Sequence, residues 1–163
     1  QQTYTPLTRQ LFSPHSLEDR CFKCQGTGVL ITIKDPSLIQ KDLSIRENCC
    51  KLAGNCSTYF YHALYQSLAD TLNFSLDTPW KQLPEHIQDT FLYGQNSLVL
   101  PVRLFDPALG KKSLTHKVWR GVLNDIGEKV RYGAKPSKYI PEGTTAVPCP
   151  KCQGIGIGEY ASA

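Results

Sequence analysis

The sequence predicts a small mixed α+β domain that contains several helices and a β-hairpin. Short runs rich in β-branched residues alternate along the chain with stretches whose apolar residues recur at helical spacing. The chain has 163 residues, and this length suits a domain with its own core. The hydrophobic fraction of 40% is too high for a disordered tail.

A repeated octapeptide predicts that a metal ion closes the base of this domain. The pattern C-x-K-C-Q-G-x-G occurs at residues 21–28 and again at residues 149–156. Two thiolates separated by two residues can bind one ion when the chain between them turns tightly, and the glycine that follows permits a positive φ. Neighbouring backbone N–H groups can then donate to the sulfurs. Two such knuckles form a structural Zn²⁺ site with no open position, and its predicted ligands are Cys21, Cys24, Cys149 and Cys152.

The remaining three of the seven cysteines do not follow this pattern. Cys49, Cys50 and Cys56 lack the knuckle glycines, so we interpret them as small buried or surface residues, with a second metal site as the alternative. The four histidines show no spacing typical of metal ligands or of a catalytic pair. They are His15, His62, His86 and His116.

Residues 1–20 are predicted to form an approach segment, residues 29–148 an insertion domain, and residues 157–163 an exit segment. The run from Val29 to Ile33 predicts a strand. A helix is expected from Ser57 or Thr58 to Asn73, where either residue can accept a hydrogen bond from an early helix N–H. Its predicted apolar side consists of Phe60, Leu64, Leu68 and Leu72, which recur every four residues.

The second half of the insertion domain predicts a helix, a hairpin and another helix. The first helix runs roughly over residues 84–93 and ends at Gly94, which can adopt the left-handed conformation. Strands are expected at residues 98–105 and 113–119, joined by a long basic connection at residues 106–112. The last helix starts near Val122 and stops near Gly133, although Gly127 in its middle lowers helix propensity. Residues 135–147 resemble a loop.

Positive charge is concentrated in the second half of the chain. Residues 103–138 contain nine Lys or Arg residues against three Asp or Glu residues. A basic hairpin with Trp119 and Tyr132 nearby could follow a phosphate backbone, while a solvated surface is the alternative. No base-reading motif is present. The candidate phosphate contacts are Lys111, Lys112, Lys117, Arg120 and Arg131.

Several classes of protein are disfavoured. The sequence has no phosphate-binding loop, no nucleophile elbow and no H-E-x-x-H motif, so the chain suits a binding or positioning module better than an enzyme. No window approaches the ~18 apolar residues of a membrane-spanning helix, and residues 1–20 lack the apolar run of a signal peptide. Because the chain contains no methionine, we expect it to be a piece of a larger protein.

A series of short motifs in a fixed order resembles the UvrA family, and within it the insertion domain with its flanking zinc knuckles. The resemblance spans nearly the whole chain. It departs from the family pattern where a strongly basic stretch is replaced by residues 124–132, and this suggests a diverged copy. The motifs are Leu11-Phe12-Ser13, Cys21-Phe22-Lys23-Cys24, Leu43-Ser44-Ile45, Ser67-Leu68-Ala69-Asp70, Asp77-Thr78-Pro79-Trp80, Leu92-Tyr93-Gly94, Trp119-Arg120-Gly121-Val122-Leu123 and Cys149-Pro150-Lys151-Cys152.

The resemblance implies a cytoplasmic, homodimeric ATPase of the ABC class as the parent protein, acting in nucleotide excision repair. Such a parent loads its partner UvrB onto damaged duplex DNA, binds ATP outside this segment and has no membrane partner. The four knuckle cysteines carry over as ligands of one zinc ion. Two alternatives remain, a zinc-binding chaperone module like the cysteine-rich region of Hsp40 proteins and a zinc scaffold that binds only proteins.

Overall fold

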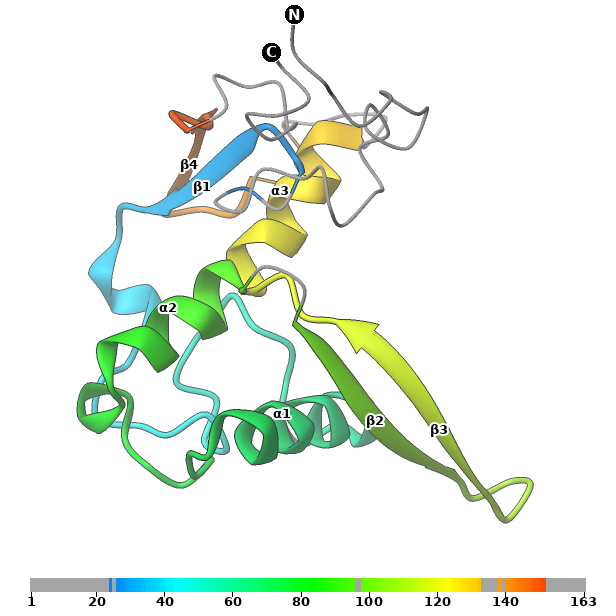
Figure 1. Ribbon diagram of the computed structural model, residues 1–163. Coiled ribbons are helices and arrows are strands. Elements are labelled where there is room, and N and C mark those ends of the chain that lie inside the picture. The colour runs from blue at the N-terminus through cyan, green and yellow to red at the C-terminus, as the bar shows by residue number, and fades with distance from the viewer. Residues whose placement is uncertain (1–23, 25, 96–97, 133–137, 139, 152–163) are drawn as a thin grey trace, which may run out of the picture. The chain divides into compact units, whose positions relative to one another are not determined.

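The computed structural model describes residues 24, 26–95, 98–132, 138 and 140–151. Helices and two small antiparallel sheets confirm the predicted α+β class (Figure 1). The predicted approach and exit segments lie outside the described residues. The elements are β1 (Val29–Ile33), the 3-10 turn η2 (Pro36–Leu38), α1 (Tyr59–Leu72), the 3-10 turn η3 (Trp80–Gln82), α2 (Glu85–Tyr93), β2 (Val99–Asp106), β3 (Lys111–Val118), α3 (Val122–Tyr132) and β4 (Thr144–Pro148).

The chain divides into two compact units, and both draw on residues of the predicted insertion domain. Unit 1 contains the described residues within 1–34, 92–97 and 120–163. Unit 2 contains residues 35–91 and 98–119. Unit 1 therefore holds β1, α3 and β4, whereas unit 2 holds α1, most of α2 and the β2–β3 hairpin.

The sheet of unit 1 contains a strand, β4, where the sequence predicts a loop. Residues 144–147 were expected in a loop, but they belong to β4, which pairs antiparallel with β1 from Val29–Pro148 to Ile33–Thr144. The hydrogen-bonding partner of β4 lies more than 100 residues earlier in the chain, so local sequence carries little signal for this strand. Helix α3 packs on β1. A Cβ on Gly127 would lie 3.4 Å from the carbonyl oxygen of Val29, an ordinary contact distance, so the packing leaves room for one.

Four aromatic rings form the centre of unit 2. Phe91 contacts Trp80, Tyr65 and Trp119, with ring centroids 5.6–5.7 Å apart. The indole N–H of Trp119 donates to the carbonyl oxygen of Thr90 at 2.7 Å, and the Tyr65 hydroxyl donates to that of Gly54 at 2.8 Å. The polar atoms of both large side chains are therefore satisfied where the rings are buried.

Helix α1 lies within the predicted span, but its buried face differs from the prediction. Phe60 is 37% exposed, and Tyr65 contributes a buried ring instead. Thr58 is the N-cap residue, yet its side chain accepts no capping hydrogen bond and donates to the carbonyl of Asn55 at 2.7 Å. Four-residue spacing drifts around a helix of 3.6 residues per turn. The buried residues are Leu64, Tyr65, Ser67, Leu68 and Ala69.

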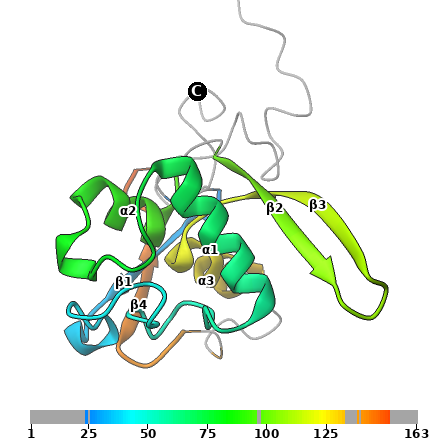
Figure 2. The same cartoon turned by 90° about the horizontal axis from the view of Figure 1, so that it is seen from below.

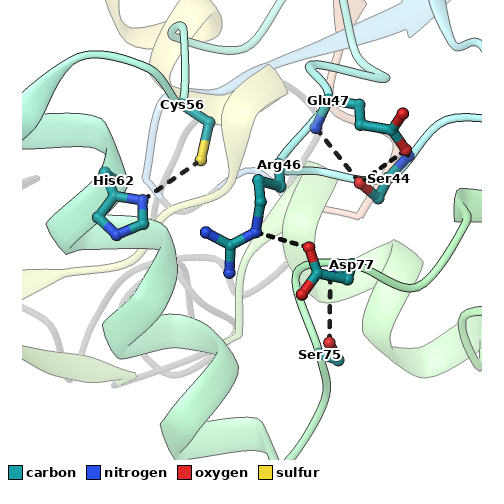
Figure 3. Close-up of polar contacts among 7 residues, drawn as sticks. All are labelled: Ser44, Arg46, Glu47, Cys56, His62, Ser75 and Asp77. Atoms are coloured by element: carbon teal, nitrogen blue, oxygen red, sulfur yellow. Dashed lines mark hydrogen bonds and ion pairs between the residues drawn. The ribbon is translucent and has the colours of Figure 1, made fainter.

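Polar contacts hold the loop before α1 in place within unit 2 (Figure 3). The Arg46 guanidinium and the Asp77 carboxylate form an ion pair with Nε and Oδ1 2.6 Å apart. The Cys56 sulfur lies 4.0 Å from Nδ1 of His62. Cys49, Cys50 and Cys56 are each no more than 3% exposed. This agrees with the interpretation of these cysteines as small buried residues.

The predicted hairpin is confirmed, with a shorter connection than expected. Strands β2 and β3 pair antiparallel from Val99–Val118 to Asp106–Lys111, which leaves residues 107–110 as the turn. Leu100 and Val102 are fully buried, because the half of the hairpin near its base packs on α1. The outer half extends beyond α1 and is exposed (Figures 1 and 2).

Candidate nucleic-acid interface and metal site

Strand β3 presents three of the five predicted phosphate contacts on the hairpin. Lys111, Lys112 and Lys117 are all exposed. Among the described residues, none of the three forms an ion pair. Lys117 extends over the ring of Phe60, with Nζ 6.0 Å from the ring centroid. The projecting hairpin thus carries cationic groups that are available to an anionic ligand.

The other two predicted contacts lie in unit 1 and differ from each other in environment. Arg120 has a side chain only 17% exposed, and its Nη1 lies 2.5 Å from Oε1 of Glu128. Arg131 is exposed near the end of α3. Arg120 is already paired with a carboxylate, so its charge is partly neutralised before any ligand binds.

The aromatic residues that the sequence placed near the basic stretch have different surroundings. Trp119 is 4% exposed and belongs to the ring cluster of unit 2, so its ring is not available to a ligand of the hairpin. Tyr132 is 53% exposed at the end of α3. A side chain as large as tryptophan stabilises a small core strongly, and here its N–H also has a partner inside that core.

Two of the four predicted zinc ligands are described, and they lie together in unit 1. Cys24 and Cys149 form one cluster of fully buried residues. The N–H of Gly28 donates to the Cys24 sulfur at 3.2 Å, and the N–H of Cys149 donates to the carbonyl of Gly28 at 2.9 Å. Gly26 has a φ of 87°. This is the positive φ that the glycine after the second cysteine of the C-x-x-C-x-G pattern is predicted to adopt.

The surroundings of Cys24 and Cys149 fit a thiolate metal site. A backbone N–H that donates to sulfur is the contact expected of a knuckle thiolate, and the antiparallel pairing of β1 with β4 brings the two knuckle cysteines to one place. Cys21 and Cys152 lie outside the described residues. Within the described part of the chain, no group of three or more His, Cys, Asp or Glu residues could bind a metal ion.

Comparisons with known proteins find a family match that includes the β2–β3 hairpin. Residues 35–142 match the family described as the UvrA DNA-binding domain. The chain belongs to the UvrA DNA-binding domain family. It is 65% identical over 160 residues to UvrABC system protein A of Chlamydia pneumoniae and 28% identical over 162 residues to that of Bacillus subtilis.

The UvrA relatives are much longer than this chain. The match to the Chlamydia pneumoniae protein covers 98% of this chain but only 9% of that protein. The match to the Bacillus subtilis protein covers 17% of that protein. The crystal structure of UvrA2 from Deinococcus radiodurans matches with a TM-score of 0.52 at 21% identity, over 96% of this chain and 21% of that one. This match supports the fold of the UvrA domain. In the described part of the chain, no helix has the length and apolar character needed to cross a bilayer.

One group of surface residues could not be predicted from the sequence. Tyr59, Arg103 and Phe105 meet beside the outer half of the hairpin, although Tyr59 lies more than 40 positions from the other two. The only sequence signal for this group was the spacing of Arg103 and Phe105, which lie two positions apart and so share one face of a strand. The position of α1 beside β2 brings Tyr59 to them.

Proposed function

We propose that this chain is a DNA-contacting module of a UvrA-type protein in nucleotide excision repair. The projecting hairpin carries three exposed lysines that form no ion pair with a described residue, and they carry the proposal together with membership of a DNA-binding domain family. Lysines bind phosphate oxygens without reading sequence, and the bound strands release counterions when they do so. The module would hold DNA by its backbone, and the contacts would be Lys111, Lys112 and Lys117, with Arg131 and to a smaller extent Arg120.

The proposal extends to a structural zinc ion held by Cys21, Cys24, Cys149 and Cys152. The adjacent burial of Cys24 and Cys149 supports it. When bound, zinc would tie the two ends of the domain together. It would leave no open coordination position for catalysis.

Resemblance to the family supports the wider setting. We propose that the parent protein is a cytoplasmic, dimeric ATPase that binds ATP outside this chain and acts on damaged duplex DNA with UvrB. This chain would contribute binding and positioning to that activity, and the ATPase chemistry would belong to other parts of the parent.

The salt dependence of DNA binding tests the role of the hairpin. In the full-length protein, replacing Lys111 and Lys112 with Ala should lower the slope of log affinity against log salt by about one per lysine removed. Lys41→Ala is the matched control, because Lys41 is an exposed lysine of the same unit that lies off the hairpin. A double variant whose slope equals that of the wild type would contradict the proposal.

A further inference from the structure

A pocket lies beside the outer half of the hairpin, entirely within unit 2. Its volume is about 460 Å³, which is in the range of small-ligand sites. Tyr59 and Phe105 are 53% and 40% exposed, so both rings can be reached from solvent. The residues that line the pocket and enter the argument are Tyr59, Arg103, Phe105, Lys112, Ser113 and Leu114.

Backbone geometry holds the two aromatic residues together. The N–H of Trp119 donates to the carbonyl of Leu98, so residues 98 and 119 form a hydrogen-bonded pair of the ladder. Because such pairs alternate, the backbone groups of Pro101, Arg103 and Phe105 point away from β3. The N–H of Phe105 donates to the Tyr59 hydroxyl. Tyr59 is therefore anchored at the edge of β2 by a hydrogen bond to the backbone of the other aromatic residue.

A second contact sets the position of the helix that carries Tyr59. The Ser67 hydroxyl donates to the carbonyl of Pro101 at 2.6 Å. Helix α1 thus contacts the edge of β2 at two points, on either side of Arg103. These two contacts hold α1 against the edge of β2 beside the pocket.

The charge of the pocket favours an anionic ligand with a flat apolar part. Phe105 pairs across the hairpin with Lys112, and Arg103 pairs with Leu114, so apolar and cationic side chains alternate on one face. No Asp or Glu lines this pocket, and neither cation forms an ion pair with a described residue. A nucleotide offers these two features in one molecule, since its base stacks on aromatic rings and its phosphate attracts Arg and Lys.

We infer that this pocket binds an unpaired base of DNA, which stacks against Phe105 and Tyr59 while Arg103 and Lys112 contact the flanking phosphates. The inference rests on the proposed DNA-binding function and narrows its substrate. A paired base presents only its edges in the grooves, whereas an unpaired base exposes its ring face. The hairpin would thus bind duplex DNA through phosphates and bind more tightly where a base has left the stack.

The test compares two short duplexes that differ by a single unpaired 2-aminopurine. The full-length protein is titrated with each duplex while fluorescence anisotropy and 2-aminopurine emission are recorded. The wild type should bind the duplex with the unpaired base about tenfold more tightly. The 2-aminopurine emission should fall as the base stacks on the protein. Equal affinity for both duplexes would overturn the inference and leave phosphate binding intact, whereas binding of neither would overturn the proposed function itself.

Variants separate stacking from general apolar contact. Phe105→Leu keeps an apolar side chain and removes the aromatic face, so the preference for the unpaired base should fall from about tenfold to about equal. Leu109→Ala is the control, because Leu109 lies in the hairpin turn, is 68% exposed and does not line the pocket. Lys112→Gln should weaken binding of both duplexes. If Phe105→Leu keeps the full preference, or if the hairpin proves to bind an acidic peptide at the same residues more tightly than DNA, the pocket is not a base site.

Discussion

Gly94 and Gly121 approach each other so closely that a Cβ on Gly121 would lie 2.3 Å from the backbone nitrogen of Gly94. Gly121 has a φ of 91°, a conformation that L side chains rarely adopt. It follows Arg120 and immediately precedes α3, so two segments of unit 1 meet there through their backbones alone.

We expect Gly121→Ala to destabilise the protein by about 3 kcal/mol or more, because backbone strain and overpacking both contribute. Urea unfolding followed by circular dichroism measures this loss. Gly127→Ala is the matched control. Its Cβ would meet Val29 at an ordinary 3.4 Å, so the gain in helix propensity of about 0.5–1 kcal/mol should dominate. Equal stability of the two variants would contradict this account of Gly121.

Trp119→Phe tests the aromatic cluster of unit 2. The change removes the indole N–H that donates to Thr90 and leaves a small void beside Tyr65 and Phe91. We expect a loss of about 1–3 kcal/mol in the free energy of unfolding. The same unfolding experiment on Leu109→Ala should show little change, since that side chain is exposed. A Trp119→Phe protein as stable as the wild type would mean that the cluster is not the centre of the core.

The Cys49 thiol should react slowly in the folded protein. Burial, with the neighbouring Cys50 thiol as a smaller cause, raises the pKa of Cys49 from 9.0 to about 12. Alkylation by iodoacetamide should therefore remain slow at pH 8 and keep rising toward pH 12, as peptide mapping by mass spectrometry would show. A short peptide with the sequence of residues 47–51 provides the unfolded comparison. Rapid alkylation of Cys49 at pH 8 without denaturant would contradict its burial.

The raised pKa of Cys49 also has a consequence for stability. The folded state holds the Cys49 thiol proton more tightly than the unfolded state does. The contribution of this thiol to the free energy of unfolding is therefore fully present below pH about 9. It is lost as pH rises from about 9 to about 12. Replacing Cys49 with Ala should therefore flatten the fall in the free energy of unfolding over this range, and an unchanged profile would rule out a role for this thiol.

Metal analysis tests the proposed knuckle. We expect one zinc ion per chain in folded protein, and its removal by a chelator should cost on the order of 10 kcal/mol of folding free energy. Cys149→Ser should abolish zinc binding, because it removes a proposed ligand. Cys56→Ser should retain it, because Cys56 belongs to unit 2 and contacts His62 instead. Folded protein without bound metal would refute the site.

Features that depend on a local pattern of residues could be predicted from the amino-acid sequence. The helices, the hairpin and β1 follow from periodicity, turn residues and β-branched runs over a few neighbouring positions. The positive φ of Gly26 and the N–H contact to the Cys24 sulfur follow from the C-x-x-C-x-G pattern, because a short loop has few ways to bring backbone donors to a cysteine sulfur.

Features that depend on residues far apart in the chain could be seen only in the folded structure. Strand β4 exists because β1 supplies its hydrogen bonds, and Phe60 is exposed because Tyr65 occupies the buried face of α1. Trp119 belongs to the core because Phe91 and Tyr65 surround it, whereas Tyr59 meets Phe105 on the surface because α1 packs along β2. Burial of a side chain is a property of its neighbours in space, and a pattern along the chain does not contain them.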